Sequence, residues 1–78
     1  MQRIENIIKE LTDEELKQCY EDSKILHTKG WLNKGFLREL TGRVQDQTEI
    51  DYNITHVENE VIKEIVRRLY GWLMKIIK

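Results

Sequence analysis

The sequence predicts an all-α fold, a compact bundle of about four helices that forms a single domain over residues 1–78. Apolar residues recur every three to four positions through most of the chain, which is the spacing of one helix face. The chain has no proline and only four glycines, so few positions oblige a helix to break. No useful stretch alternates apolar with polar residues, as a half-buried strand would.

The first helix is predicted at about residues 2–10. It carries one apolar stripe whose members are three to four residues apart: Met1, Ile4, Ile7, Ile8 and Leu11.

The second helix is predicted at about residues 13–28, and signals mark both of its ends. Thr12 can accept a hydrogen bond from the amide of Glu15, and the Glu15 carboxylate can return to the amide of Thr12. This reciprocal pair is a capping box, which begins many helices. The helix is expected to stop near Gly30, since glycine is one of the few stop signals in a chain without proline.

The third helix is predicted at about residues 34–44, with Asn33 as its N-cap. Its inward stripe consists of Phe36, Leu37, Leu40 and Val44. The polar stretch 45–54 has no strong period, and we interpret it as a loop. Its acidic part, residues 46–53, lacks the glycine and the ligand spacing of an EF-hand, so a solvated loop is expected there.

The fourth helix, predicted at about residues 56–77, is the most informative element. Thr55 and Glu58 can form a second capping box at its start. Apolar residues fill about 180° of its circumference, whereas an ordinary surface helix has an apolar stripe of roughly 100°. These residues are Val61, Ile62, Ile65, Val66, Leu69, Tyr70, Trp72, Leu73, Ile76 and Ile77. We therefore expect a helix that continues through Gly71 and lies in a groove between two helices or against a second protein; a largely bare helix would contradict this expectation.

Composition and charge disfavour several classes of function. The net charge of −1 gives no general positive field for nucleic acid or for an anionic membrane. Cys19 is the only cysteine, so the internal disulfides typical of small secreted domains are ruled out. No apolar run approaches the ~18 residues of a membrane span, and the N-terminus lacks the apolar core of a signal peptide. A cytoplasmic location is expected.

Enzymatic motifs are absent from the sequence, which has no phosphate loop, nucleophile elbow or HExxH pattern. Cys19 lies on the apolar stripe of its helix, and we expect a small buried hydrophobic residue rather than a nucleophile. His27 and His56 show no metal-ligand spacing with it and are expected near helix ends. We predict no enzymatic activity, no cofactor and no metal.

Two other classes of function compete with protein binding. Residues 16–26 and 36–44 could form a helix-turn-helix that presents Lys34, Arg38 and Arg43 to DNA. Their connection is longer than the usual turn of about 3–4 residues, and acidic neighbours oppose a polyanion. The last helix is amphipathic and basic near its end, so it could instead lie on a membrane surface. Both nucleic acid and membrane are disfavoured relative to a protein partner.

Part of the chain carries a family resemblance. It rests on Leu11-Thr12-Asp13-Glu14, on Tyr20 and Ser23, and on Leu32-Asn33-Lys34 with Phe36, Leu37 and Leu40. Through these positions, residues 11–44 resemble Sda, a family of helical-hairpin inhibitors of sporulation histidine kinases. The resemblance implies binding to a signalling kinase and a block of phosphotransfer. It also implies a hairpin seam formed by Leu16, Tyr20, Phe36 and Leu40. The last helix of this chain is additional to that hairpin.

The leading hypothesis is a small helical regulator of bacterial or phage origin, an inhibitor or adaptor that occludes a functional surface of a larger protein. Large aromatic residues and arginine dominate interface energetics, which selects the expected contact residues: Trp31, Arg67, Arg68, Tyr70 and Trp72. Trp31, beside Gly30, is expected to cover the core in preference to anchoring a partner. Alanine at Arg67 and Arg68 is expected to leave folding intact. If self-association satisfies the excess apolar surface, the chain is a homodimer through the last helix.

Overall fold

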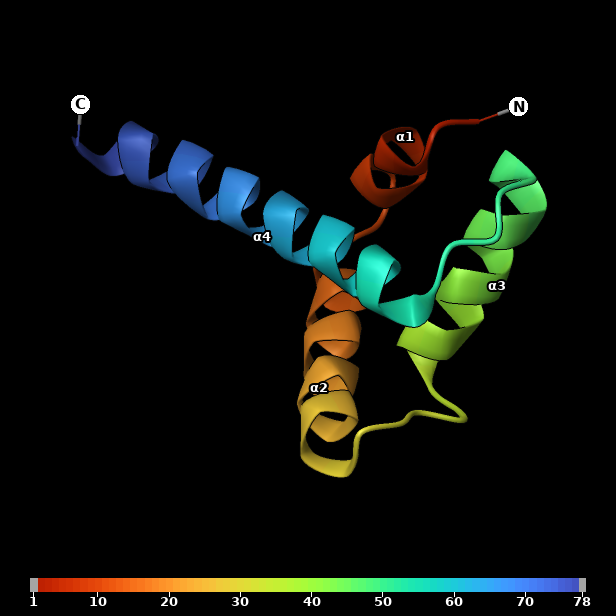
Figure 1. Ribbon diagram of the computed structural model, residues 1–78. Coiled ribbons are helices and arrows are strands. Elements are labelled where there is room, and N and C mark those ends of the chain that lie inside the picture. The colour runs from red at the N-terminus through yellow and green to blue at the C-terminus, as the bar shows by residue number, and fades with distance from the viewer. Residues whose placement is uncertain (1, 78) are drawn as a thin grey trace.

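The computed structural model describes residues 2–77, and these residues form four helices. The helices are α1 (Ile4–Lys9), α2 (Asp13–Lys29), α3 (Phe36–Thr48) and α4 (Ile54–Ile77). No strand occurs in the described range. Figure 1 shows α4 crossing the molecule with α1 above it, α2 below it and α3 beside its first turns, and α4 contacts all three. The predicted all-α bundle with a long last helix is therefore confirmed.

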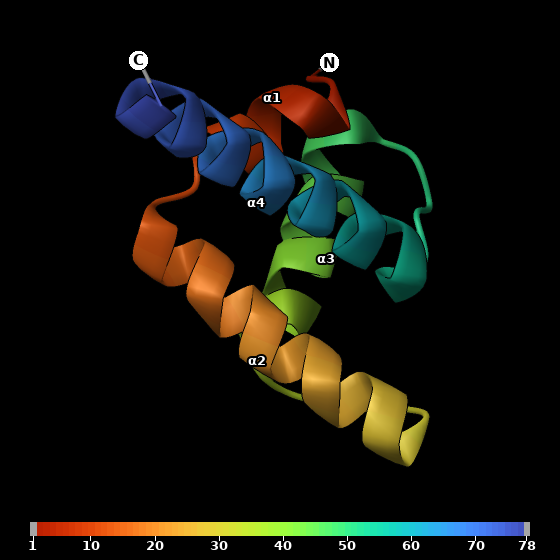
Figure 2. The same ribbon diagram turned by 90° about the vertical axis from the view of Figure 1, so that its left-hand side faces the viewer.

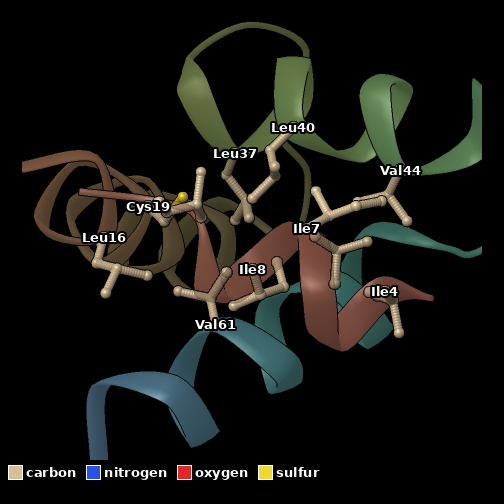
Figure 3. Packing of buried hydrophobic residues seen from close by; sticks show 11 residues of the cluster. Ile4, Ile7, Ile8, Leu16, Cys19, Leu37, Leu40, Val44 and Val61 are labelled. Atoms are coloured by element: carbon tan, nitrogen blue, oxygen red, sulfur yellow. The ribbon is translucent and has the colours of Figure 1, made fainter. Parts of the chain in front are cut away.

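The core lies where the first half of α4 meets the other three helices. Figure 3 shows apolar side chains that converge on this point from all four helices. The buried set consists of Ile4, Ile7, Ile8, Leu11, Leu16, Cys19, Leu37, Leu40, Val44, Val57 and Val61. Helices α1, α2 and α3 contribute apolar residues of the faces that their spacing predicts, whereas α4 contributes Val57 and Val61 together with the buried carboxylates of Glu58 and Glu64.

Helix α1 is shorter than the predicted 2–10. Arg3 has an extended backbone, and the amide of Gln2 donates a hydrogen bond of 3.2 Å to the Gln47 carbonyl of α3. The chain therefore enters the helix only at Ile4, because Gln2 is held against α3 instead.

The ends of α2 agree with the sequence. The Thr12 amide donates to Glu15 Oε1 at 2.8 Å, and the Glu15 amide donates to Thr12 Oγ1 at 3.1 Å, so the capping box is complete. Gly30 follows the last turn in the left-handed conformation, with φ of 81°, and its amide donates to the Leu26 carbonyl. Both signals are local, and local chemistry decides both ends.

Helix α3 begins at Phe36, and the predicted start at residue 34 with Asn33 as N-cap is wrong. Gly35 precedes the helix with φ of 118°, and the amide of Leu37 donates to Asp22 Oδ2 of α2 at 2.9 Å. A carboxylate from a neighbouring helix thus replaces the local cap. A Cβ at Gly35 would lie 2.8 Å from Asp22 Oδ2, so both the backbone angle and this close approach favour glycine.

Helix α3 also ends later than predicted, at Thr48 rather than at residue 44. The buried hydroxyls of Thr41 and Thr48 donate to the carbonyls one turn earlier, Leu37 O at 2.9 Å and Val44 O at 2.7 Å. Each polar group is therefore satisfied inside the core, and a helical turn without apolar residues still packs there. The interpretation of residues 45–54 as a loop is correct only from Glu49 to Asn53.

Helix α4 begins at Ile54, two residues before the predicted start, and the expected capping box of Thr55 and Glu58 does not form. Asn53 Oδ1 accepts a hydrogen bond of 2.8 Å from the His56 amide instead. The Glu58 side chain is buried and accepts a hydrogen bond from Ser23 Oγ of α2. The Glu58 carboxylate, which the predicted capping box would place near Thr55, is therefore bonded to Ser23 of α2 instead.

Helix α4 continues through Gly71 as predicted, but the rest of the chain covers only its first half. Figure 1 shows the last turns of α4 extending away from α2 and α3. Figure 2 shows the first turns of α2 below the C-terminal half of α4. Residues 54–65 contribute to the core, whereas residues 66–77, here called the distal segment, do not. The expectation that α4 lies in a groove between other helices is confirmed for its first half. The distal segment is bare, which contradicts that expectation there, and its contact with a second protein stays a prediction. Among the described residues, no helix combines the length and the apolar composition needed to cross a membrane.

Candidate protein-binding surface on helix α4

The distal segment exposes a continuous set of large apolar side chains. Eight of its twelve residues are apolar and between 43% and 68% exposed: Val66, Leu69, Tyr70, Trp72, Leu73, Met74, Ile76 and Ile77. Single exposed apolar residues are ordinary on a protein surface, but eight within three turns of one helix are not. Contiguous apolar surface of this size is typical of a site that binds another molecule.

A groove continues this surface toward α2. It has a volume of about 490 Å³ and lies between the first turns of α2 and the middle of α4. Its walls are largely apolar, with charged side chains among them: Asp13, Leu16, Lys17, Tyr20, Ile65, Arg68, Leu69 and Trp72. The two helices run in broadly opposite senses here, as the pairing of residue 13 with 68 at one end and of residue 27 with 58 at the other shows. The groove therefore has the form of a trough between two helices.

Arg68 is a structural residue of this trough. Its guanidinium donates to Glu64 Oε2 at 2.9 Å and to Asp13 Oδ1 at 2.8 Å. It also donates to the carbonyls of Leu11 at 2.7 Å and Lys9 at 3.2 Å, which are unpaired groups at the end of α1. From the sequence, Arg68 was expected to contact a partner, and alanine at this position was expected to leave folding intact. In the structure, the N–H groups of its guanidinium are instead hydrogen-bonded within the chain. We therefore treat Arg68 as the clamp that fixes α4 to the corner between α1 and α2.

Glu64 is the acidic member of the clamp. Burial alone would raise its pKa, but hydrogen bonds from Arg68 and Arg67 outweigh that effect, and the pKa of Glu64 is lowered from its ordinary value of 4.5. Burial tends to lower the pKa of Arg68, and its hydrogen bonds to Glu64 and Asp13 outweigh that tendency, so the pKa of Arg68 is raised. Each charged form thus stabilises the other.

This lowered pKa predicts a dependence of stability on pH. Because the folded state holds the Glu64 proton less tightly than the unfolded state, its contribution is complete above about pH 4.5 and is lost as the pH falls through the lower, folded-state value. The free energy of unfolding should therefore fall more steeply below pH 4.5 in the wild type than in Glu64→Gln. Urea unfolding between pH 3 and pH 7 measures both slopes, and equal slopes would contradict the assignment.

Three of the other residues selected by sequence lie together on the distal segment. Tyr70 and Trp72 are exposed, at 63% and 60%, and Trp72 also lines the trough. Arg67 pairs with Glu64 Oε1 at 2.7 Å, yet its side chain remains 51% exposed. These three residues are therefore available to a partner.

Trp31 lies apart from these residues, in the connection between α2 and α3. Figure 1 places this connection at the end of α2 that is remote from the distal segment. Trp31 is 56% exposed, so the expectation that it covers the core is wrong. It borders a second hollow of about 450 Å³ together with Ile25 and Leu32. The structure therefore separates the candidate contact residues into two surfaces.

The remaining candidates for chemistry are structural. Cys19 is buried, and burial raises the pKa of its thiol to about 12, so the predicted role as a small buried hydrophobic residue is confirmed. Glu58 binds both Ser23 and His27, the latter with Nε2 at 2.9 Å from Oε2. The serine hydroxyl thus donates to a carboxylate and not to an imidazole base, which differs from a catalytic triad. Within residues 2–77, no three His, Cys, Asp or Glu side chains are grouped so that they could hold a metal ion.

The α2 wall of the trough is not predicted by the sequence. The family resemblance implies that Tyr20 lies in or near the seam between α2 and α3, but Tyr20 is 48% exposed and faces the trough. Leu16 and Leu40 are buried as that resemblance implies, and Phe36 is half-buried. Tyr20 follows Leu16 by one helical turn, so the sequence places both residues on the same face of α2. The sequence does not show which other helix this face meets.

A comparison of the chain with protein-family models, with curated proteins and with solved structures finds no match in any of the three.

Proposed function

We propose that this protein is a small protein-binding regulator, an inhibitor or adaptor that acts by steric occlusion, and that it binds through the distal segment of α4 and the adjoining trough. The observation that carries the proposal is the exposure of eight large apolar side chains on one projecting helix. Ile65 is the last residue of α4 that packs against the core of the chain. Burial of the apolar surface that follows it therefore requires a second molecule.

The composition of this surface favours a protein partner. Trp72 on the trough side of α4 and Tyr70 on the other side supply the aromatic anchors that contribute most to binding free energy, and Arg67, one turn before Tyr70, supplies a charged contact beside that ring. The trough has the shape of a site for an amphipathic helix, which inserts its apolar face between two helices. The resemblance of residues 11–44 to kinase inhibitors makes a signalling kinase the first partner class to test.

The test compares two tryptophans by the same substitution. Trp72→Ala should weaken binding to the partner by at least ~30-fold, because a buried aromatic anchor contributes about 2 kcal/mol or more. Trp31→Ala, which removes an equally exposed ring from the other end of α2, should bind as the wild type does. Each protein is immobilised, cognate cell extract is passed over it, and the retained protein is identified and titrated.

Equal retention by all three proteins would contradict the distal segment as the binding surface. Loss with Trp31→Ala alone would move the site to the connection between α2 and α3. Both rings are more than half exposed, so circular dichroism should show unchanged folding for either variant, which keeps the comparison free of stability effects.

A membrane surface is the second candidate, and one observation favours it. Arg67 and Lys75 lie on the polar side of the distal segment, where cations of an interfacial helix meet anionic lipid. Co-sedimentation of the chain with anionic vesicles, but not with neutral ones, would support this candidate.

A further inference from the structure

We propose that the molecule on this surface is a second copy of the chain, bound so that the two distal segments lie antiparallel and each enters the trough of the other. This inference rests on the proposed function, because it assigns the partner of the same surface. It follows from the spacing of the exposed residues, from the shape of the trough and from the area that is left uncovered.

The spacing is that of a helix–helix seam. Val66, Leu69, Leu73 and Ile76 follow one another at intervals of three, four and three residues, and all four are exposed. Apolar residues at these intervals form the a and d positions of a heptad, through which two helices pack side chains into each other's gaps. A stripe at such positions pairs naturally with an identical stripe.

The charges of α4 are compatible with this seam. At about 100° per residue, Arg67 and Lys75 lie roughly 140° from the centre of the stripe, so neither cation faces its counterpart across the pair. Arg68 points toward α2, and its charge is neutralised by Asp13 of α2 and by Glu64 of α4. Self-association therefore brings no like charges together at the contact.

A seam of fewer than two heptads is short for an isolated coiled coil, which usually needs three or four heptads, and the trough supplies the missing contact. Trp72 and Ile65 lie on the side of the stripe that faces α2, beside Leu16 and Tyr20. A second distal segment on this stripe would touch α4 on one side and α2 on the other. The wide apolar face needs two neighbours, and a second copy supplies both of them.

The antiparallel direction follows from the same contacts. With opposite directions, the tip of each distal segment reaches the trough of the other chain, and both troughs are filled. With parallel directions, both tips point away from both troughs, which leaves Tyr20 uncovered. The antiparallel pair therefore removes more apolar area from water.

The area agrees with what a stable dimer needs. If each aromatic side chain offers about 150–250 Å² and each aliphatic one somewhat less, the exposed parts of the four stripe residues, of Trp72 and of Tyr20 amount to on the order of 600 Å² per chain. A pair that covers this area on both chains buries about 1,200 Å², which is the lower end of the range for specific interfaces.

The register that uses only exposed residues places Val66 opposite Ile76 and Leu69 opposite Leu73. The next register toward the bundle would require Ile62, which is only 38% exposed because it lies within the covered half of α4. We therefore expect four layers of contact, related in pairs by a two-fold axis that crosses the seam at the height of residue 71 along the helix.

The first measurement is the mass of the full chain in solution by sedimentation velocity. At roughly 100 µM, well above the weak end of dissociation constants for interfaces of this size, the main species should have twice the chain mass of 9.4 kDa. Leu69→Glu places a carboxylate in the seam and should weaken association at least ~100-fold. Gly71→Glu adds the same side chain on the opposite side of α4, where a new Cβ meets no atom within 4 Å, and should remain a dimer.

The second measurement tests direction and register by disulfide formation. Val66→Cys and Ile76→Cys proteins, when mixed and oxidised, should form a covalent heterodimer, because these positions face each other only in the antiparallel pair. Neither protein alone should cross-link, since identical positions are about ten residues out of register, or roughly 15 Å apart. Cys19 is buried with its thiol protonated, so it does not compete. Cross-linking of each protein with itself would overturn the antiparallel arrangement.

The remaining outcomes separate this inference from the proposed function. A wild-type chain that stays monomeric at roughly 100 µM overturns the dimer, whatever else it binds. If that monomer retains another protein in a manner that depends on Trp72, the proposed function stands without the dimer. If it retains none and sediments with anionic vesicles, both fail and the membrane candidate replaces them. A dimer that Leu69→Glu and Gly71→Glu disrupt equally also overturns the assigned seam.

Discussion

Replacement of Leu40 by alanine is expected to lower the free energy of unfolding by about 3–4 kcal/mol. Leu40 is fully buried in α3 and belongs to the core that all four helices share. Truncation removes apolar contacts and leaves a cavity that close-packed neighbours fill only in part. A domain of this length has a total stability of about 4–12 kcal/mol, so this one change removes a large part of it.

Leu69→Ala is the matched control, with the same change of side chain in a residue that is 59% exposed. In the monomer it should alter stability by no more than about 0.5 kcal/mol, because little apolar contact is lost and alanine favours a helix. Urea unfolding followed by circular dichroism measures both variants, at a low protein concentration where self-association adds nothing. Similar losses for the two variants would show that the distal segment is covered within one chain.

Replacement of Arg68 by alanine is expected to cost about 2–3 kcal/mol, the second largest effect. The change removes hydrogen bonds to two carboxylates and to two backbone carbonyls at the end of α1. It also leaves Glu64, which is buried, with Arg67 as its remaining cation. Hydrogen bonds with charged partners contribute about 1.5–3 kcal/mol each, and a buried group that loses its partner adds a desolvation cost.

Arg67→Ala is the control for this prediction. Arg67 makes one ion pair with Glu64 and is 51% exposed, so its removal should change stability by less than about 1 kcal/mol. Arg68→Lys should fall between the two, because an ammonium group keeps the charge and loses the planar fork that reaches several oxygens at once. Thermal unfolding of the three variants gives the order, and an equal loss for Arg67→Ala and Arg68→Ala would contradict the clamp.

Helix ends show how far local chemistry extends in this chain. The capping box of Thr12 and Glu15 and the stop at Gly30 depend on neighbours within four residues, and both are predicted correctly. The predicted start of α3 is wrong because Asp22 caps it from another helix. The predicted start of α4 is wrong because Ser23 holds the Glu58 carboxylate, and a different local residue, Asn53, caps the helix. Where a distant group satisfies a helix end, no local pattern reveals it.

The residues of the candidate surface also fall into those that the sequence predicts and those that it does not. Tyr70 and Trp72 were predicted as exposed contacts because large aromatic residues dominate interfaces, and both are exposed. Arg68 was chosen on the same grounds, but its role depends on the corner between α1 and α2, which a single helix cannot show. The resemblance implied that Tyr20 meets α3, but Tyr20 faces α4 across the trough, and its spacing from Leu16 gives only the face of α2 on which it lies.

The sequence by itself determined that the chain is helical, that Cys19 is buried and that apolar residues surround half of α4. Each of these properties is fixed by residues within a few turns of one another, where helical geometry relates spacing directly to position in space. Only the tertiary structure decided which half of α4 is covered. Helices α1, α2 and α3 all pack around its first half, so the rest of its apolar face extends beyond them into water.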